Sequence, residues 1–347
     1  MKSFRLKIIW FLLSIVIILG LLTGYRAYRM IQSPNVSIGE SSIFFLVPSG
    51  TDFDQLVTGL RSDSILKDES SFVQVSKWMK FRDTNIKPGR YRIDPEWSNR
   101  QLISVFRSGL QTPINVVINN ARTIEDVAGK ISDYLEPDSI DFLHTFKDSN
   151  SIAKLGFSPI TLMCVFIPNT YEMFWNTTPE KFLDRMVNEH NLFWARNNRS
   201  LKADSINLTP QQVYTLASIV EKETLTSFEK PIVAGLYLNR LRLGMPLQAD
   251  PTIVFAVGDF FLQRILNKHL EIDSPFNTYR YGGLPPGPIC MPSVKSIDAV
   301  LDPKDHDYLY MCAQPGNNGL HAFARNLREH NENAVKYRSW LNERGIR

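Results

Sequence analysis

The sequence has few cysteines and histidines, and neither residue type is arranged to hold a metal ion. Its three cysteines, Cys164, Cys290 and Cys312, lie far apart and form no CxxC or Cys/His spacing. This pattern excludes a disulfide framework and a zinc site, although one bridge could form, and we expect buried free thiols. The six histidines also lack ligand spacing. The sequence therefore predicts no metal site.

A strong net charge and nucleotide-binding motifs are also missing. The formal net charge is +4, and lysine and arginine are spread along the chain, so nothing predicts a nucleic-acid groove. No GxSxG, Walker A or GxGxxG match lies between a strand and a helix, which leaves esterase, NTPase and dinucleotide functions without a motif. Lys222 has no cofactor cradle around it and is expected on the polar side of its helix. We expect no cofactor and no nucleic-acid partner.

Charge is absent from one long stretch near the N-terminus. Residues 8–25 are almost entirely aliphatic or aromatic. As a helix they would rise roughly 27 Å, close to the hydrocarbon thickness of a bilayer. Three basic residues precede the run and two follow it, which favours cytoplasmic residues 1–7 and a body exported across the plasma membrane. No A-x-A site follows, so we expect a retained single-pass anchor instead of a cleaved signal peptide.

Beyond the anchor, periodicity predicts an α+β protein with two domains. We expect a polar stalk over 26–42 and a small α+β domain over 43–112. In that domain the pattern predicts strands near 43–48 and 89–93 and helices near 53–60, 71–79 and 98–106. A larger mixed α/β domain is expected over 113–347, opening with a strand at 114–118 and a helix from about 124.

One helix of the larger domain carries candidate chemistry. Thr209, Pro210 and Gln212 form a capping box with proline in the first turn, so a helix start is well specified. Glu221 and Glu223 fall on opposite edges of its apolar face. A carboxyl group against apolar neighbours has a raised pKa and can act as a general acid. Helical geometry alone does not choose between the two glutamates, and a solvated surface glutamate is the plainer alternative.

The segments after this helix resemble the walls of a binding site. A predicted helix ends at Gly244, and a loop exposes Gln248, Asp250 and Thr252. Two more loops, at 274–279 and 283–289, are rich in proline and carry amide, hydroxyl and aromatic side chains. Such side chains suit sugars, which offer hydroxyl groups and C–H faces, but plain structural turns remain the alternative.

Several motifs together resemble the YceG-like family of endolytic murein transglycosylases. They are Leu216–Thr224, Asn239-Arg240-Leu241, Leu247–Thr252, Asn277-Thr278-Tyr279, Gly283–Ile289 and His321–Asn326, in the order that the family has. The resemblance covers nearly the whole chain. One departure is Asn119-Asn120-Ala121, where the family commonly has a Pro-Glu-Gly turn.

The resemblance implies a reaction and a set of site residues. It implies cleavage of MurNAc–GlcNAc β-1,4 bonds within nascent peptidoglycan strands, which leaves 1,6-anhydroMurNAc ends and stops elongation. It assigns Glu221 as the acid and then the base, and it makes 43–112 a LysM-like domain and 113–347 the catalytic domain. It also implies work beside penicillin-binding proteins at the membrane. The substrate-binding residues expected on this basis are Glu223, Gln248, Asp250, Thr252, Asn277, Thr278, Tyr279, His321 and Asn326.

A transglycosylase of this kind needs only one carboxyl group, because the sugar's own 6-hydroxyl is the attacking group. Most glycosidases need two. No second obligatory acid stands out here, and Asp250 is the nearest candidate for a supporting role. The alternatives are a wall-binding scaffold without activity and a hydrolytic muramidase.

Overall fold

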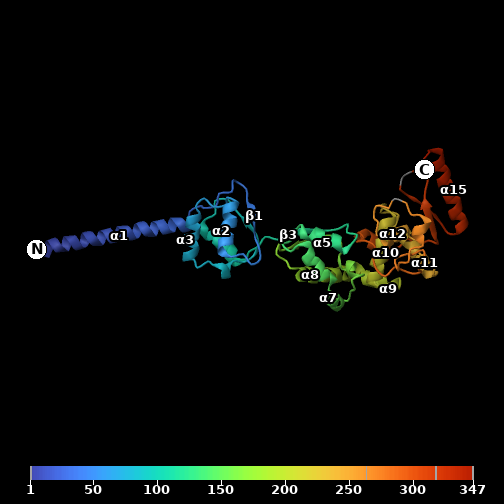
Figure 1. The fold of residues 1–347 in the computed structure, drawn as a ribbon, viewed down its shortest axis with the longest axis horizontal. Coiled ribbons are helices and arrows are strands. Elements are labelled where there is room, and N and C mark those ends of the chain that lie inside the picture. Colours follow the sequence, from blue (N-terminus) through green and yellow to red (C-terminus); the bar gives the residue numbers. More distant parts are fainter. Residues whose placement is uncertain (1, 263, 317–318, 346–347) are drawn as a thin grey trace. The chain divides into compact units, whose positions relative to one another are not determined.

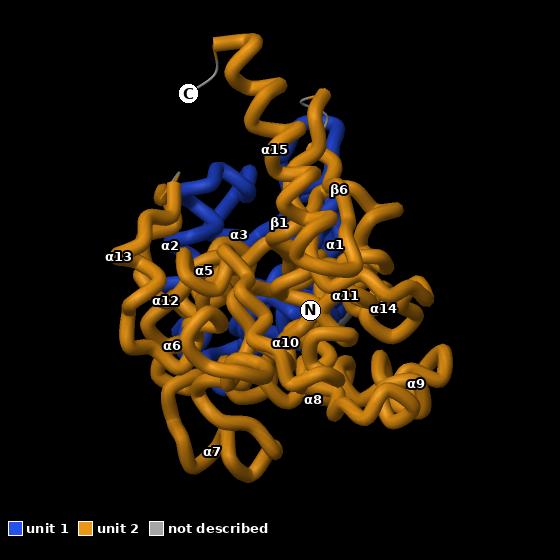
Figure 2. The backbone as a smooth tube through the Cα atoms, turned by 90° about the vertical axis from the view of Figure 1, so that its right-hand side faces the viewer, with its two compact units in different colours: residues 1–114, 172–177 blue, residues 115–171, 178–347 orange. Residues whose placement is uncertain are grey.

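The computed structural model describes residues 2–262, 264–316 and 319–345. Met1 of the expected cytoplasmic segment lies outside them. The chain is a mixed α+β protein that divides into two compact units (Figures 1 and 2). The first unit comprises Met1–Ile114 and Glu172–Thr177, and the second comprises Asn115–Tyr171 and Thr178–Arg347.

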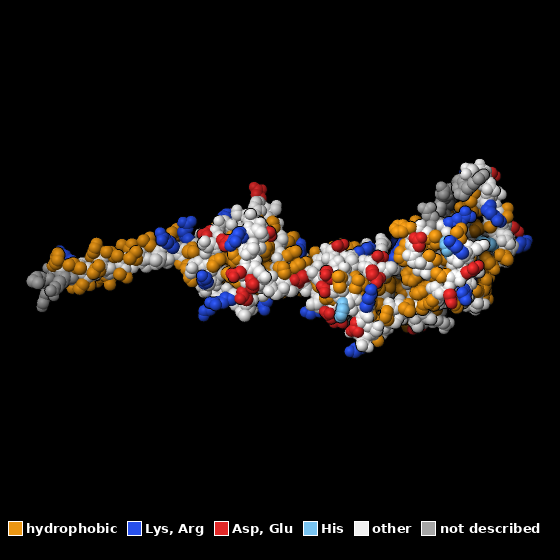
Figure 3. All heavy atoms as spheres, viewed as in Figure 1, with side chains coloured by type: hydrophobic (Ala, Val, Ile, Leu, Met, Phe, Trp, Pro, Cys, Tyr) orange, Lys and Arg blue, Asp and Glu red, His pale blue; other side chains and the backbone are white. Residues whose placement is uncertain are grey.

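The first unit begins with a long apolar helix, α1 (Lys2–Gln32). Its segment Leu6–Gln32 is long and apolar enough to cross a membrane, and none of the most apolar window is buried within the protein. Hydrophobic side chains cover most of the length of α1 in Figure 3. An apolar surface of this kind is stable only when something other than water covers it, which is consistent with a membrane anchor.

The expected polar stalk at 26–42 is not separate from the first unit. Helix α1 continues to Gln32, and Val36 is fully buried. The amide of Asn35 donates hydrogen bonds to the carbonyl oxygen of Asp68 (2.8 Å) and to Oδ1 of Asn99 (2.7 Å). The amide oxygen of Asn35 accepts a hydrogen bond from the backbone N–H of Asp68 (2.8 Å). The sequence predicts a polar stalk over 26–42, and within it Val36 and Asn35 pack against the rest of the first unit.

The rest of the first unit follows the predicted order of strands and helices. Ser98 and Gln101 form a capping box at the start of the last helix, and Gly109 ends that helix in the left-handed conformation at φ +72°. Strands β1 and β2 pair antiparallel, with Phe45 opposite Tyr91. The elements are β1 (Ile43–Val47), α2 (Phe53–Ser62), α3 (Glu69–Trp78), the 3-10 helix η1 (Asp83–Asn85), β2 (Gly89–Ile93) and α4 (Asn99–Ser108).

The second unit is mainly helical and has short two-stranded sheets, one pairing β3 with β4 and one pairing β5 with β6 antiparallel. Its first strand and helix agree with the predicted pattern at 114–118 and from 124. The strands are β3 (Ile114–Ile118), β4 (Asn169–Met173), β5 (Tyr310–Ala313) and β6 (His321–Ala324). The α-helices are α5 (Ile124–Ser132), α6 (Ser139–Lys147), α7 (Ser149–Lys154), α8 (Pro179–Ala195), α9 (Arg199–Ser205), α10 (Pro210–Glu223), α11 (Lys230–Arg242), α12 (Asp250–Val257), α13 (Asn267–Leu270), α14 (Val294–Leu301) and α15 (Leu327–Glu343). The 3-10 helices are η2 (Leu162–Val165) and η3 (Arg196–Asn198).

Helix α10 lies at the centre of the second unit, in contact with α9, α11, α12 and α14. The predicted capping box of Thr209 and Gln212 is present at its N-terminus. Every residue from Val213 to Val220 is buried, so the helix is covered on all sides over two turns. The hydroxyl of Ser218 accepts a hydrogen bond from the backbone N–H of Ile289 (3.0 Å) and so fixes the proline-rich loop against the helix. Beyond this buried stretch, the last turn of α10 reaches the surface, and it carries both candidate glutamates.

Replacing Asn35 tests whether residues 33–38 are part of the folded body. Asn35→Ala removes three buried hydrogen bonds, so we expect the free energy of unfolding to fall by about 2–3 kcal/mol. Urea unfolding of the full chain in detergent measures this loss. Glu40→Ala, at an exposed position in the same segment, is the control and should change nothing. Equal stability of both variants would restore the stalk interpretation.

Candidate active site

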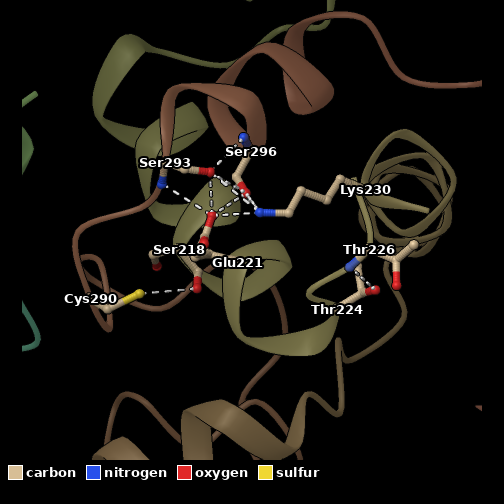
Figure 4. Close-up of polar contacts among 8 residues, drawn as sticks. All are labelled: Ser218, Glu221, Thr224, Thr226, Lys230, Cys290, Ser293 and Ser296. Atoms are coloured by element: carbon tan, nitrogen blue, oxygen red, sulfur yellow. Dashed lines mark hydrogen bonds and ion pairs between the residues drawn. The ribbon is translucent and has the colours of Figure 1, made fainter. Parts of the chain in front are cut away.

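Glu221 lies in a polar cluster in which three helices meet (Figure 4). Its Oε2 atom is 2.7 Å from the ammonium of Lys230, at the start of α11. The same oxygen accepts hydrogen bonds from the hydroxyl of Ser293 (2.6 Å), the backbone N–H of Ser293 (3.1 Å) and the hydroxyl of Ser296 (2.5 Å). Lys230 also donates to the Ser296 hydroxyl (2.8 Å). Ser293 caps α14, so the cluster joins α10, α11 and α14.

These contacts make Glu221 an ionised residue. Burial would raise its pKa, but the hydrogen bonds from Lys230, Ser293 and Ser296 outweigh burial, and the pKa is lowered. The expectation that apolar neighbours keep Glu221 protonated is therefore wrong. The reason is that the Glu221 carboxylate contacts Lys230 on the next helix and two serines, Ser293 and Ser296, that are far away in the sequence.

Glu223 has the environment that was expected for Glu221. Its Oε1 atom accepts one hydrogen bond, from the hydroxyl of Tyr237 on α11 (2.6 Å). Burial raises the pKa of Glu223 to about 7, with the Tyr237 hydrogen bond opposing the rise and the negative charge of Asp250 adding to it. The side chain still reaches solvent, because it lines two cavities. Near neutral pH this carboxyl group can therefore give a proton to a molecule bound in either cavity.

Glu223 and Asp250 lie on the walls of both cavities. The first, which we call the polar cavity, has a volume of about 230 Å³, and the second, the basic cavity, has a volume of about 340 Å³. The polar cavity is lined by Glu223, Leu236, Tyr237, Arg240, Leu247, Gln248, Asp250, Tyr279, Met311, Cys312, Ala313 and His321. The basic cavity is lined by Arg122, Lys222, Glu223, Asp250, Pro251, Val254, Phe255, Phe260, Leu262, Ile265 and Ile289. A chain molecule could occupy both while one of its bonds lies beside Glu223.

Arg240 holds one wall of the polar cavity. Its guanidinium is buried and donates hydrogen bonds to the carbonyl oxygens of Leu309 (2.6 Å), Pro246 (3.0 Å) and Leu247 (3.0 Å). It also donates to Oε1 of Gln248 (3.2 Å), whose backbone is in the left-handed region at φ +52°. This arrangement presents the exposed Gln248 side chain at the cavity and fixes the start of α12.

A hydrogen-bonded carboxylate–histidine pair, Glu229 and His321, borders the polar cavity. Glu229 is 2% exposed, and its carboxylate accepts hydrogen bonds from the hydroxyl of Thr224 (3.0 Å) and the backbone N–H of His321 (2.9 Å). Nδ1 of His321 lies 3.1 Å from Oε2 of Glu229. If Nδ1 carries the proton, Nε2 of His321 is left as an acceptor for a ligand hydroxyl in the cavity.

Among the described residues no group of three or more His, Cys, Asp or Glu side chains could hold a metal ion.

The structure divides the predicted substrate-binding residues into two groups. Glu223, Gln248, Asp250, Tyr279 and His321 line the polar cavity. Thr252, Asn277 and Thr278 do not line it, and their side chains are buried. Asn326 is exposed, caps α15 by accepting a hydrogen bond from the Glu329 N–H (3.0 Å), and lines neither cavity.

The buried members of that set hold the loops that carry the exposed ones. Asn277 donates to the carbonyl oxygens of Leu270 and Ile272 and accepts from the N–H of Tyr279, so its amide is fully used within its own loop. Thr252 and Thr278 are hydrogen-bonded to each other through their hydroxyls (2.8 Å). Asp250 and Thr252 lie in the first turn of α12 and not on a loop as predicted.

Several site residues were missed by the sequence analysis. Tyr237 and Arg240 are three positions apart on α11, and this spacing places both on one face of the helix. That signal was available, since Asn239-Arg240-Leu241 was already part of the resemblance. Lys230, Ser293 and Glu229 carry no local signal, because each of them also depends on a partner that is far away in the sequence: Ser296, Glu221 and His321 respectively.

Comparison with known proteins finds a family model, named relatives and a solved structure that are similar to this chain. Residues 45–336 match the model of the YceG-like family. A protein of Bacillus subtilis (strain 168) named endolytic murein transglycosylase is 27% identical, over 91% of this chain and 90% of its own length. A protein of the same name from Streptococcus pneumoniae serotype 2 is 26% identical, over 94% of this chain and 65% of its own length. A crystal structure of a yceG-like protein from Listeria monocytogenes has a TM-score of 0.55 and 28% identity, and the match covers 85% of this chain and 99% of that one.

Glu221→Gln should destabilise the protein in a pH-dependent way. The substitution leaves the buried ammonium of Lys230 without its anion, which costs about 3 kcal/mol of the free energy of unfolding at pH 7. The folded-state pKa of Glu221 is lowered, so its contribution is present above the unfolded value of about 4.5 and disappears as the pH falls through the folded value. Urea unfolding at several pH values should therefore give curves for wild type and variant that converge in acid.

The control for this measurement is Glu343→Gln, at an exposed position near the end of α15. A constant difference between Glu221→Gln and wild type at every pH would mean that the carboxylate charge plays no part in stability.

Proposed function

Because the chain belongs to the YceG-like family, whose model matches residues 45–336, we propose that it is a membrane-anchored endolytic murein transglycosylase. Its substrate is the glycan of peptidoglycan, and it cuts MurNAc–GlcNAc β-1,4 bonds inside nascent strands to leave 1,6-anhydroMurNAc ends, which stops elongation. Relatives that carry this name match over most of the chain. The two cavities that meet at one protonatable carboxyl group are what such a reaction requires.

Within this proposal Glu223 is the catalytic acid and base, in place of Glu221. The observation that carries the assignment is its raised pKa of about 7 at a position that lines both cavities. In the first step the Glu223 proton goes to the bridging oxygen as the bond to C1 of MurNAc breaks. In the second step the 6-hydroxyl of the same MurNAc attacks C1 and gives its proton back to Glu223. One carboxyl group serves both steps, and no water is consumed.

Glu221 has a different task, which is to position the last turn of α10. Its carboxylate is committed to Lys230, Ser293 and Ser296 and lines neither cavity. An ionised group with a lowered pKa is a poor proton donor at neutral pH. Glu221 therefore affects the reaction only indirectly, by holding the helical turn that positions Glu223.

The polar cavity receives sugar units. Gln248 and His321 offer hydrogen-bonding groups, and the ring of Tyr279 can cover the C–H face of a sugar. The phenol hydroxyl of Tyr279 donates a hydrogen bond to Asp250, and this bond orients both side chains at the N-terminus of α12. Thr252, Asn277 and Thr278 support this wall from behind.

The apolar helix α1 anchors the protein in the plasma membrane with its N-terminus in the cytoplasm. The body then lies outside, where newly made glycan emerges, and close to the penicillin-binding proteins that polymerise it. The β1-α2-α3-β2 order of the first unit, with its antiparallel strand pair, supports a LysM-like domain that helps to hold glycan. Basic residues that precede the apolar run support this orientation.

A hydrolytic muramidase is the second candidate, and Asp250 is the observation in its favour. Asp250 lines both cavities together with Glu223 and could activate a water molecule as the second carboxylate of a hydrolase. The hydrogen bond from Tyr279 occupies one oxygen of Asp250, which weakens this use. The products distinguish the two reactions, because a reducing MurNAc end is about 18 Da heavier than an anhydro end.

Glu223→Gln should abolish cleavage and leave glycan binding in place. Glutamine has nearly the same shape but cannot donate the required proton, so we expect the rate to fall by about 10³-fold or more. Mass spectrometry of uncrosslinked glycan incubated with the full chain measures anhydro ends. Glu221→Gln is the matched variant and should keep a measurable rate. If Glu221→Gln were inactive while folded and Glu223→Gln remained active, the assignment made from the sequence resemblance would be the correct one.

The pH dependence of kcat/KM should follow the pKa of Glu223. The protonated form is the active one in the free enzyme, so kcat/KM should fall as the pH rises through about 7. Asp250→Asn removes a charge that raises this pKa and should move the alkaline limb to lower pH. Tyr237→Phe removes a hydrogen bond that lowers it and should move the limb to higher pH. Shifts in the same direction for both variants would show that the limb belongs to another group.

A further inference from the structure

The basic cavity holds two cationic side chains that make few contacts with the protein. Arg122 and Lys222 both line it beside Glu223. Among the described residues Lys222 has no ion pair or hydrogen bond through its ammonium, and the guanidinium of Arg122 donates one hydrogen bond, to the carbonyl oxygen of Phe260 (3.2 Å). The remaining N–H groups of Arg122 are available to a ligand.

Arg122 is held in place by its surroundings. Its backbone N–H donates to Oδ2 of Asp126 (2.8 Å), and its guanidinium lies 4.9 Å from the centre of the Phe260 ring. The preceding loop is held by Lys130, whose ammonium donates to the carbonyl oxygens of Asn119 (2.6 Å) and Asn120 (3.2 Å). Binding a ligand at this guanidinium therefore costs little side-chain entropy, which favours a planar, two-pronged contact with a carboxylate.

The charge balance of the basic cavity favours an anion. The basic cavity has two carboxyl groups. Asp250 accepts a hydrogen bond from Tyr279, and Glu223 is largely neutral up to a pH of about 7. The cavity also has two positive charges, on Arg122 and Lys222. The remaining wall is apolar and consists of Pro251, Val254, Phe255, Phe260, Leu262, Ile265 and Ile289. The cavity thus suits a ligand that has a carboxylate next to short apolar groups.

The polar cavity differs in this respect. Its arginine, Arg240, is buried and donates its hydrogen bonds to backbone carbonyl oxygens and to Gln248. The two sides of Glu223 therefore offer different chemistry. The basic cavity is cationic and apolar, whereas the polar cavity is neutral and suits hydroxyl groups. An alternating glycan has two kinds of sugar unit that differ in the same way, because only the muramic acid unit carries a lactyl-peptide arm on its O3 atom.

We propose that the basic cavity is the subsite for the carboxylate-bearing O3 arm of the muramic acid unit whose C1 bond is cleaved. This inference rests on the proposed function. It fixes the direction of the strand, with the muramic acid unit on the side of Arg122 and Lys222 and the leaving N-acetylglucosamine unit in the polar cavity. The arm then makes the enzyme select which of the two alternating bonds lies beside Glu223.

The test compares two substrates on the full chain in detergent. One is uncrosslinked glycan with peptide arms whose carboxylates are free, and the other is the same glycan after those carboxylates have been converted to methylamides. Wild type should cleave the free-acid strands with a kcat/KM about tenfold higher, a ratio typical of one hydrogen-bonded charge contact. Arg122→Gln should lose about tenfold on the free-acid strands and much less on the methylamide strands, so that the ratio falls toward one. Lys222→Gln should act in the same direction and is less disruptive, since Lys222 is exposed.

The control variant is Lys202→Gln, an exposed lysine on α9 that lines neither cavity, and it should keep the wild-type ratio. Equal cleavage of both substrates by wild type would overturn the subsite. An equal loss on both substrates in Arg122→Gln and Lys222→Gln would do the same, because it would mean a structural role. If wild type formed no anhydro ends from the free-acid strands, the proposed function itself would fail, and this outcome is distinct from the other two.

Discussion

The buried ammonium of Lys230 is the group on which the geometry of the candidate site depends. Lys230 is 5% exposed, and an unpaired charge at such a place would be strongly destabilising. Its partners are Glu221 at the end of α10 and Ser293 and Ser296 at the start of α14. Because Lys230 itself begins α11, one cation ties together the ends of three helices. The last turn of α10 cannot move without breaking this cluster.

That constraint explains how two glutamates in one helical turn come to differ. Glu221 and Glu223 are two residues apart, so they project from α10 at about 200° to one another. Glu221 turns toward Lys230 and is ionised, while Glu223 turns toward Tyr237 and the cavities and has a pKa near neutrality. The same backbone thus presents one carboxylate that holds the helix and one carboxyl group that can exchange a proton.

The sequence predicts the local structure well and the site only in part. The helix start with a capping box at Thr209 follows from contacts within four residues and is found as predicted. The choice between Glu221 and Glu223 was left open by periodicity, and it could not be made without knowing where Lys230 and Ser293 lie. Asn277 and Thr252 have the residue types of sugar ligands, but the same amide and hydroxyl groups also close loops, and burial decides between the two uses.

A pKa near 7 has a particular value for a reaction that uses one group twice. The acid step needs a proton on the carboxyl group, and the base step needs the same group without it, so a pKa far from the working pH would slow one of the two. Burial alone would push the pKa of Glu223 up, as would Asp250, whereas the Tyr237 hydrogen bond pulls it down. The balance depends on Tyr237 staying within 2.6 Å of Oε1, and Tyr237 lies on α11, the helix that Lys230 begins. The ion pair of Glu221 with Lys230 thus fixes α10 against α11 and helps to keep the Tyr237 hydroxyl where its hydrogen bond opposes the rise that burial causes in the pKa of Glu223.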